Sequence, residues 1–402
     1  MRKIHRGSSP AEGEPLSAGR VEYLEAARQR ARSRRLRRGA IIVVVLTVLV
    51  LFATGAVGTS IARAKDLVDS VHITLTPNTG WPQQTGITEP TAVAKLSGGF
   101  AEMDTDTCVV YSFGGAKLNS VQSGYARPAL AAGKTRFVLY NRSGNELRVE
   151  SRTQNLYTKQ MENSIFLCAV ADNGNLAVVT EDISAMAKLL VYNANMEEVL
   201  RWSMSSNDGT PLRMAFSPDG RKLAAAAVTA GGGQMMTNLY LVNLASGDPV
   251  SLANQSGVPQ WLGWTSASTI LAVYDSRAVL YNAGGGERAA YEFAGNTLKD
   301  ISVDAAGNVA LLLGSGQLHQ AVLLDKSLNV QFSGTVSSAN SIVRAGSLFY
   351  LLSDSGAECY NTSGEQQWSQ TLAAKPQALL ADTKELLLFS GNTAQVLEVP
   401  QK

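Results

Sequence analysis

A short pattern recurs along residues 91–402: an apolar strand, a polar or glycine-containing turn, and a more apolar strand. The clearest copy is "LRMAFSPDGRKLAAA", which begins at Leu212. Two copies of an apolar strand separated by such a turn predict a β-hairpin. The other copies begin at Thr91, Pro128, Leu167, Trp261, Asp300, Ser341 and Gln377.

A second hairpin pattern follows most of these copies after a gap. It is an apolar strand that ends in Tyr-Asn or a similar pair, then a turn and an outer strand, as in "LLVYNANMEEVLRW" from Leu189. Two hairpins make a four-stranded antiparallel unit, and the mean spacing of about 40 residues is the size of a propeller blade. No helical periodicity of useful length follows residue 70. The sequence therefore predicts an all-β fold, an eight-bladed β-propeller, with seven blades as the alternative.

Two places in the chain leave the blade register open. Tyr140 in "VLYNRSG" comes only 29 residues after Tyr111, and Tyr192 comes 52 residues later. The second blade is therefore either short in one hairpin or registered differently. The last unit supplies only three strands, so we predict that "DSVHITLTPN", Asp69–Asn78, forms the missing outer strand and closes the ring.

Two stretches resemble known propeller repeats. "FSPDGRKLA" resembles the repeat of TolB-type and WD40-like propellers, and "ECYNTSGEQQW" resembles a blade end of pyrroloquinoline-quinone-type propellers. The whole layout is similar to an uncharacterised bacterial family of single-pass membrane proteins with an extracytoplasmic propeller. The resemblance implies a propeller over about residues 90–400 and carries no catalytic residues to this chain.

An uncharged apolar segment precedes the repeats. Gly39–Ala62 holds 24 residues without a charge, and a bilayer core needs about 20 apolar residues in a helix. The arginine-rich flank Arg28–Arg38 places the N-terminus in the cytoplasm and the rest outside it. A cleaved signal peptide with the site Ala62–Ala64 is the alternative.

We therefore predict four regions in a protein of the cytoplasmic membrane, with the propeller outside. They are a basic cytoplasmic leader (1–38), a transmembrane helix (39–62), a linker with the closing strand (63–90) and the propeller (91–402).

The charge is distributed unevenly. Residues 1–65 hold 13 Lys and Arg against 4 Glu, whereas the remainder holds 22 against 29 acidic residues. A basic N-terminal segment followed by an acidic remainder indicates that the two parts of the chain lie in different compartments. Next to an apolar segment, the basic run favours contact with anionic lipid over nucleic acid, so no nucleic-acid partner is predicted.

The motifs of common enzyme classes are missing from the sequence. No two of the three histidines stand at metal-ligand spacing, and there is no C-x-x-C pair or G-x-S-x-G elbow. "AGKT" (132–135) has Pro128 where a phosphate-binding loop needs Gly. Cys108, Cys168 and Cys359 lie in apolar runs and are predicted to be buried, unpaired side chains. We therefore predict no cofactor, no metal and no enzyme activity.

Four residues are candidates for partner binding. Trp261 and Trp264 break the pattern of the other repeats, whereas Trp202 and Trp368 recur at blade ends and are predicted to pack between blades. Met235 and Met236 lie in the glycine-rich insertion 229–238, predicted to be either a binding loop or a plain hairpin.

These residues favour a non-enzymatic binding or scaffold module for a protein or polymer of the cell envelope. The alternatives are an extracytoplasmic enzyme (a hydrolase or a quinone-type dehydrogenase) and a ligand sensor that works through a cytoplasmic partner.

Overall fold

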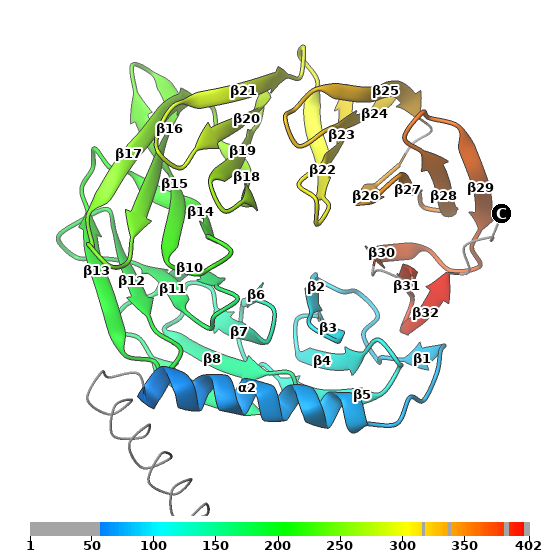
Figure 1. Ribbon diagram of the computed structural model, residues 1–402, viewed down its shortest axis with the longest axis horizontal. Helices are drawn as coiled ribbons and strands as arrows, with labels where there is room; N and C mark the ends of the chain where they lie inside the picture. Colours follow the sequence, from blue (N-terminus) through cyan, green and yellow to red (C-terminus); the bar gives the residue numbers. More distant parts are fainter. Residues whose placement is uncertain (1–56, 316–317, 337–338, 382–385, 398–402) are drawn as a thin grey trace, which may run out of the picture. The chain divides into compact units, whose positions relative to one another are not determined.

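The described part of the chain is a ring of four-stranded antiparallel sheets (Figure 1). The computed structural model describes residues 57–315, 318–336, 339–381 and 386–397. Within these ranges there are eight such sheets, so the predicted eight-bladed propeller is confirmed. Ala62–Lys402 form one compact unit.

The strands follow one another from the centre of the ring outwards in each blade. Blade 1 is β2 (Ala92–Leu96), β3 (Gly99–Met103), β4 (Thr107–Ser112) and β5 (Lys117–Gln122), and blade 2 is β6 (Pro128–Ala132), β7 (Arg136–Asn141), β8 (Glu146–Ser151) and β9 (Asn155–Gln160). Blade 3 is β10 (Ile165–Val170), β11 (Leu176–Thr180), β12 (Ala187–Tyr192) and β13 (Glu198–Met204), and blade 4 is β14 (Thr210–Phe216), β15 (Lys222–Gly231), β16 (Gln234–Asn243) and β17 (Pro249–Ser256). Blade 5 is β18 (Pro259–Ser266), β19 (Thr269–Tyr274), β20 (Arg277–Asn282) and β21 (Glu287–Glu292), and blade 6 is β22 (Thr297–Val303), β23 (Val309–Ser315), β24 (Leu318–Leu324) and β25 (Val330–Val336). Blade 7 is β26 (Ser341–Ala345), β27 (Leu348–Leu352), β28 (Gly356–Asn361) and β29 (Gln366–Thr371), and blade 8 is β30 (Pro376–Ala381), β31 (Leu386–Ser390), β32 (Thr393–Leu397) and the returning β1 (Gln83–Gln84).

The core lies between neighbouring blades. Every residue of β3, β11 and β19 is buried, because each face of a blade packs against one of its two neighbouring blades. Outer strands such as β5 keep polar positions in solvent. Trp202 packs in the core between blades 3 and 4, and Trp368 in the core between blades 7 and 8, as predicted.

The recurring Tyr-Asn pair has a structural role. In seven blades the register shifts between the third and fourth strands near the end of the third strand, as at Val191–Tyr192. The Asn that follows the Tyr fixes the next turn: Asn193 Oδ1 accepts hydrogen bonds from the backbone N–H groups of Asn195 and Glu197. The pattern therefore marks a bulge and a turn.

Blade 2 explains the irregular tyrosine spacing. Tyr140 belongs to β7, the second strand of its blade, whereas Tyr111 and Tyr192 belong to third strands. The third strand of blade 2 is β8, whose sequence "ELRVES" has no Tyr-Asn pair. The second blade is thus registered differently, one of the two predicted alternatives.

The Ser-Pro-Asp-Gly turn is closed by its own side chains. Ser217 Oγ accepts the Lys222 N–H at 2.9 Å and donates to Asp219 Oδ1 at 2.6 Å. Gly220 has φ +68, in the left-handed region, and a Cβ there would strike the Asn173 side chain. This turn is structural.

The prediction that Asp69–Asn78 forms the closing strand is wrong. Residues Val57–Leu75 form helix α2, despite the β-branched residues of "VHITLT". Tertiary contacts of its polar side chains decide the conformation, because Asp66 and Asp69, three residues apart, reach the ring together only from a helix.

The predicted transmembrane helix is not tested by the structure. Of Gly39–Ala62, the part up to residue 56 lies outside the described residues. Within the described residues, no helix is both long enough and apolar enough to cross a membrane.

Two buried ion pairs attach α2 to the ring. Asp66 Oδ1 lies 3.0 Å from Arg136 Nε, and Asp69 Oδ2 lies 2.9 Å from Arg152 Nε. Arg152 also donates to Ser70 Oγ at 2.7 Å and to the Ser97 carbonyl at 2.7 Å. The side chains of both arginines are only 2% exposed, so their charges depend on these partners.

The ring closes through a short segment after α2. Gln83 and Gln84 of β1 pair with Ala394 and Thr393 of β32, so the outer strand of blade 8 comes from the N-terminal side of the ring. The Tyr111 hydroxyl of blade 1 donates to the Gln84 carbonyl at 3.2 Å. One segment therefore joins the first blade to the last.

A buried carboxyl lies at this junction. Glu102 of β3 is 2% exposed, and its Oε2 has no hydrogen-bond partner among the described residues. Burial raises the pKa of Glu102 to about 7; a hydrogen bond from Thr85 opposes this rise, and nearby Asp104 adds to it.

We predict that Glu102 makes the ring less stable as pH rises from about 4.5 to about 7. The folded protein keeps this proton up to about pH 7, whereas the unfolded chain loses it near 4.5, so the folded state binds more protons in between. Replacing Glu102 with Gln should therefore raise the free energy of unfolding at pH 8, relative to pH 5, by up to roughly 3 kcal/mol.

Urea unfolding of wild type and Glu102→Gln at both pH values measures this difference. The exposed Glu89, changed to Gln, is the matched control and should shift neither value. Parallel pH profiles for wild type and Glu102→Gln would contradict the prediction.

A second prediction concerns the attachment of α2. Asp69→Asn leaves the buried Arg152 charge without its carboxylate and should weaken docking of the helix by about 3–5 kcal/mol. Hydrogen exchange of the α2 amides should then be much faster than in wild type. Asp172→Asn is the control, because its partner Lys134 is 70% exposed and such exposed ion pairs contribute about 0–1 kcal/mol. Equal exchange rates of the α2 amides in all three proteins would contradict the prediction that the Asp69–Arg152 pair holds the helix on the ring.

Candidate binding surfaces

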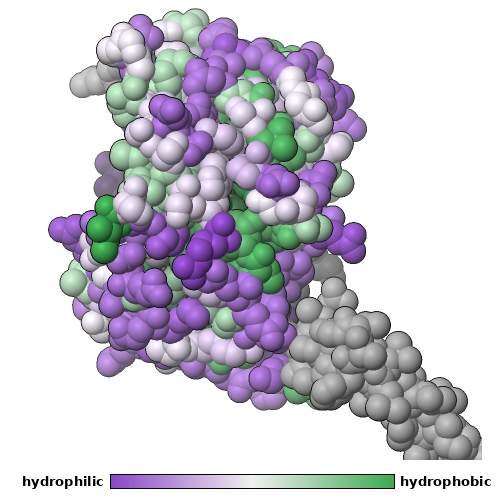
Figure 2. All heavy atoms as spheres, turned by 90° about the vertical axis from the view of Figure 1, so that its left-hand side faces the viewer, coloured by the Kyte–Doolittle hydropathy of each residue, from purple (hydrophilic) through white to green (hydrophobic). Residues whose placement is uncertain are grey.

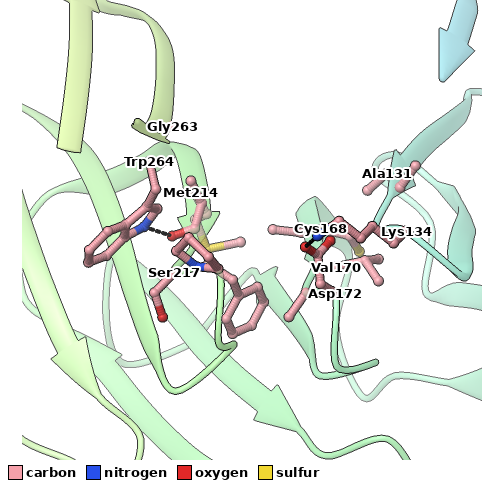
Figure 3. A pocket seen from close by; sticks show the side chains of 15 residues that line it. Ala131, Lys134, Cys168, Val170, Asp172, Met214, Ser217, Gly263 and Trp264 are labelled. Atoms are coloured by element: carbon pink, nitrogen blue, oxygen red, sulfur yellow. Dashed lines mark hydrogen bonds and ion pairs between the residues drawn. The ribbon is translucent and has the colours of Figure 1, made fainter. Parts of the chain in front are cut away.

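The first candidate surface is a cavity of about 490 Å³ at the centre of the ring. The inner strands of blades 2–5 line it, with Trp264 and Met214 on one side and Cys168 on the other (Figure 3). Its wall combines apolar side chains with polar groups, and the ion pair between Lys134 Nζ and Asp172 Oδ2, 2.7 Å apart, lies at its edge. Its size suits a small ligand or a short peptide segment.

The two predicted tryptophans lie on β18 and face different neighbours. Trp264 lines the cavity, and its Nε1 donates to the Ala215 carbonyl of blade 4 at 3.0 Å. Trp261 packs in the core between blades 5 and 6, and its ring covers Gly263, where a Cβ would clash. The structure does not bring the two rings together on one surface, and their role in binding stays a prediction.

A second cavity of about 800 Å³ is lined by the inner strands of blades 1, 6, 7 and 8. Its charged groups are already used within the protein. Arg344 donates to the carbonyls of Val309 and Leu324, both at 3.0 Å. Asp300 Oδ2 accepts from Ser341 Oγ at 2.6 Å and from the Ile342 N–H at 2.8 Å. These contacts hold adjacent blades together.

The histidine of blade 6, His319, also has a structural contact. His319 Nδ1 accepts the backbone N–H of Ala339 at 3.2 Å. Across the described residues, no three His, Cys, Asp or Glu side chains are grouped in a way that could hold a metal ion.

The three cysteines are buried in separate blades. Cys108 lies in blade 1, Cys168 in blade 3 and Cys359 in blade 7, so the predicted burial is confirmed. Burial raises the pKa of the Cys108 thiol to about 12 and that of Cys359 to about 11, and it raises the pKa of Cys168 as well. Such thiols stay protonated and are poor nucleophiles.

The methionine insertion is a hairpin that extends blade 4. β15 and β16 have ten residues each, against five to seven in the second and third strands of the other blades. Their pairing continues to Gly231–Gln234, with the turn at Gly232 and Gly233. Met235 near the tip is half exposed and Met236 is partly buried. The insertion is thus a hairpin in conformation, and its role in binding stays a prediction.

This hairpin lies on the face of the ring opposite α2. Helix α2 contacts turns that join first to second strands and third to fourth strands, such as Thr135 and Arg152, and we call that side the α2 face. Loops that join second to third strands lie on the other side, because neighbouring strands are antiparallel. We call this side the far face.

A second exposed loop of the far face lies in blade 3, between β11 and β12. Ile183 there is 97% exposed and Met186 is half exposed. The loop is held by Asp182, whose Oδ1 accepts from the Ser184 N–H at 2.8 Å and whose Oδ2 pairs with Lys188 at 3.0 Å. The Ser184 amide and Lys188 hold the pKa of Asp182 down at about 2.

The loop of blade 3 and the hairpin of blade 4 flank the same connection, residues 205–209. The Met186 N–H donates to the Met204 carbonyl at 2.9 Å, and Thr229 Oγ1 donates to the Ser206 carbonyl at 3.3 Å. We call Ile183, Met186 and Met235 the far patch. Figure 2, which looks at the side of the ring formed by blades 3–5, shows hydrophobic areas separated by hydrophilic ones.

Sequence reasoning found only part of the far patch. The glycine run pointed to Met235, whereas Ile183 and Met186 were missed. Their signal was present but weak: a lone Ile within the polar loop "EDISAM", between two apolar strands.

These observations define the class of the protein: an eight-bladed β-propeller with a central cavity and three exposed apolar side chains on loops of one face. By its sequence, the chain belongs to the family of unknown function DUF5711, whose family model matches residues 78–324. No curated protein matches the sequence.

Several solved structures share the fold. BamB from Moraxella catarrhalis is 14% identical, with 76% of this chain and 95% of that chain covered and a TM-score of 0.50. The C-terminal WD40 domain of Sif2 is 10% identical, with 80% and 99% covered and a TM-score of 0.58. Sqt1 of Chaetomium thermophilum, bound to the N-terminus of ribosomal protein L10, is 10% identical, with 78% and 97% covered and a TM-score of 0.52. At these identities the likeness shows the propeller fold alone, which agrees with the predicted WD40-like repeats.

We predict that the three thiols resist alkylation in the folded protein. Iodoacetamide at pH 8 should modify none of them in native protein and all three after unfolding, as counted by mass spectrometry, because burial keeps them protonated and out of contact with solvent. Rapid modification of Cys168 in the native state would show that the cavity it lines opens further than the structure indicates.

Proposed function

We propose that this protein is a membrane-anchored, non-enzymatic propeller that binds a protein partner outside the cytoplasmic membrane. The observation that carries the binding role is the far patch, in which Ile183, Met186 and Met235 are exposed on two loops of adjacent blades. Exposed apolar residues that stand singly are common on soluble proteins, whereas these three lie on adjacent loops of one face.

The chemistry of the patch favours a protein over a polysaccharide. Sugars are commonly bound by stacking on aromatic rings, and none of the large hydrophobic side chains exposed in the described residues is aromatic. Aliphatic and thioether side chains instead suit the apolar part of a protein interface, where methionine adapts to the partner's shape. Sqt1, a propeller of similar fold, was solved bound to the N-terminus of another protein, which supports a segment of a protein as the partner.

The anchored state rests on the sequence. Gly39–Ala62 is long and apolar enough for one membrane span, and the basic run Arg28–Arg38 favours a cytoplasmic N-terminus. In this arrangement the propeller lies outside the cytoplasm.

The non-enzymatic role rests on where the polar side chains are used. Arg344, Asp300 and His319 all take part in structural hydrogen bonds, and the thiols are buried.

Photo-crosslinking from the far patch tests the binding role. A photo-reactive amino acid at Ile183 or at Met235, in the full-length protein in its native membrane, should capture one and the same partner. Ser246 is the matched control, because it is exposed in the same blade but on the α2 face. When the photo-reactive group is at one of these two positions, an aspartate at the other (Ile183→Asp or Met235→Asp) should weaken capture by about tenfold or more. Each aspartate places a charge in an apolar contact worth roughly 1–3 kcal/mol. Capture of different proteins from the two positions, or equal capture from Ser246, would refute the proposed patch.

A further inference from the structure

Helix α2 turns an apolar stripe away from the ring. Leu67, Val68, Val71 and Leu75 are between 55% and 75% exposed. They stand at positions i, i+1, i+4 and i+8, which lie on one side of an α-helix. A docked amphipathic helix normally buries such a stripe against its own protein. Here the stripe has no cover among the described residues of the chain.

The ion pairs prevent the helix from turning this stripe inward. Asp66, Asp69 and Ile73 lie on the opposite side of α2, and they contact Arg136, Arg152 and the turn at Gly98. Rotation of the helix would leave two buried arginines without their carboxylates and would expose Ile73, which together offset the gain from burying the four aliphatic side chains. The outward orientation of the stripe is therefore fixed by the fold.

The charges beside the stripe fit an anionic surface. Lys65 and His72 are exposed along its edge, and both acidic residues of this part of the helix, Asp66 and Asp69, point to the ring. A helix with an apolar stripe edged by basic groups is typical of the boundary between lipid headgroups and acyl chains.

The sequence places a lipid bilayer close to the stripe. The uncharged segment Gly39–Ala62 ends five residues before Leu67. At 1.5 Å per residue, Leu67 lies about 8 Å along the helix from Ala62. Because α2 is one helix from Val57 to Leu75, the whole stripe meets the lipid where α2 lies along the membrane surface and residues 39–56 make the span.

We propose that the outward stripe of α2 lies in the headgroup region of this same membrane and so holds the α2 face of the propeller against the lipid. This inference rests on the proposed membrane anchor and adds a second contact to it. The far patch, on the opposite face, then points away from the membrane towards its partner. The ion pairs of α2 are the rigid link between lipid and ring.

Fluorescent labels on the full-length protein test the proposal. Val71→Cys and Leu67→Cys are labelled with an environment-sensitive dye in nanodiscs of phosphatidylethanolamine and phosphatidylglycerol that hold one copy each. The buried native thiols leave the introduced cysteine as the labelling site, and unsubstituted protein serves as the labelling control. Ile183→Cys, on the far face, is the exposed control.

The expected result is a blue-shifted emission at residues 67 and 71, with quenching by doxyl lipids and with iodide quenching several-fold weaker than at residue 183. Unchanged melting curves of the labelled variants exclude unfolding as the cause. If the protein floats with vesicles but iodide reaches residue 71 as readily as residue 183, the stripe is in water and the inference is overturned while the anchor stands. If the dye is shielded only in discs that hold two copies, the stripe is a contact between copies, which also overturns it. If the protein does not float with vesicles at all, the anchor itself fails and the inference fails with it.

Discussion

Closure of the ring is the constraint on which the rest of the structure depends. Each blade is apolar on both faces, so a first or last blade without a neighbour would expose a complete core face. Phe100 of blade 1 meets Phe389 of blade 8 edge to face, with ring centroids 5.0 Å apart. Gln83 and Gln84 add backbone pairing across the same junction. The central cavities and the two faces of the ring exist only because these blades meet.

The buried arginines that hold α2 fix geometry more than they add stability. Apolar side chains in place of Arg136 and Arg152 could pack at equal or lower free-energy cost, but α2 could then dock in several orientations about its own axis. A buried arginine accepts a single arrangement, because every other one leaves its charge unpaired. The outward stripe of α2 thus follows from two ion pairs, each between residues about 70 to 83 positions apart in the sequence.

The range of the deciding interactions separates what the sequence could predict from what it could not. Blades were predictable because a hairpin and its turn are local, as in "FSPDGRKLA", where Ser217 and Asp219 close the turn that they occupy. The third strand of blade 2, "ELRVES", was missed because it lacks the continuous apolar run and the Tyr-Asn ending that mark third strands elsewhere. The C-terminal part of α2, from Asp69 on, was predicted as a strand because the helix's partners lie in blade 2, and no local pattern records them. Trp261 and Trp264 were grouped by sequence, yet a strand places them against different blades.

The two faces of the ring differ in the length of their loops. Asp or Asn side chains that accept the next backbone N–H groups close turns on both faces: Asn193, Asp219, Asp304, Asp325 and Asn361 on the α2 face, and Asp182 in the Ile183 loop of the far face. On the far face the chain varies loop length, through the extended hairpin of blade 4 and the Ile183 loop, and it places methionines there. A face of short turns suits fixed attachment, and a face of longer, methionine-bearing loops suits recognition of a protein. The difference between the two faces therefore follows from the antiparallel meander itself, because alternate connections of every blade lie on opposite sides of the ring.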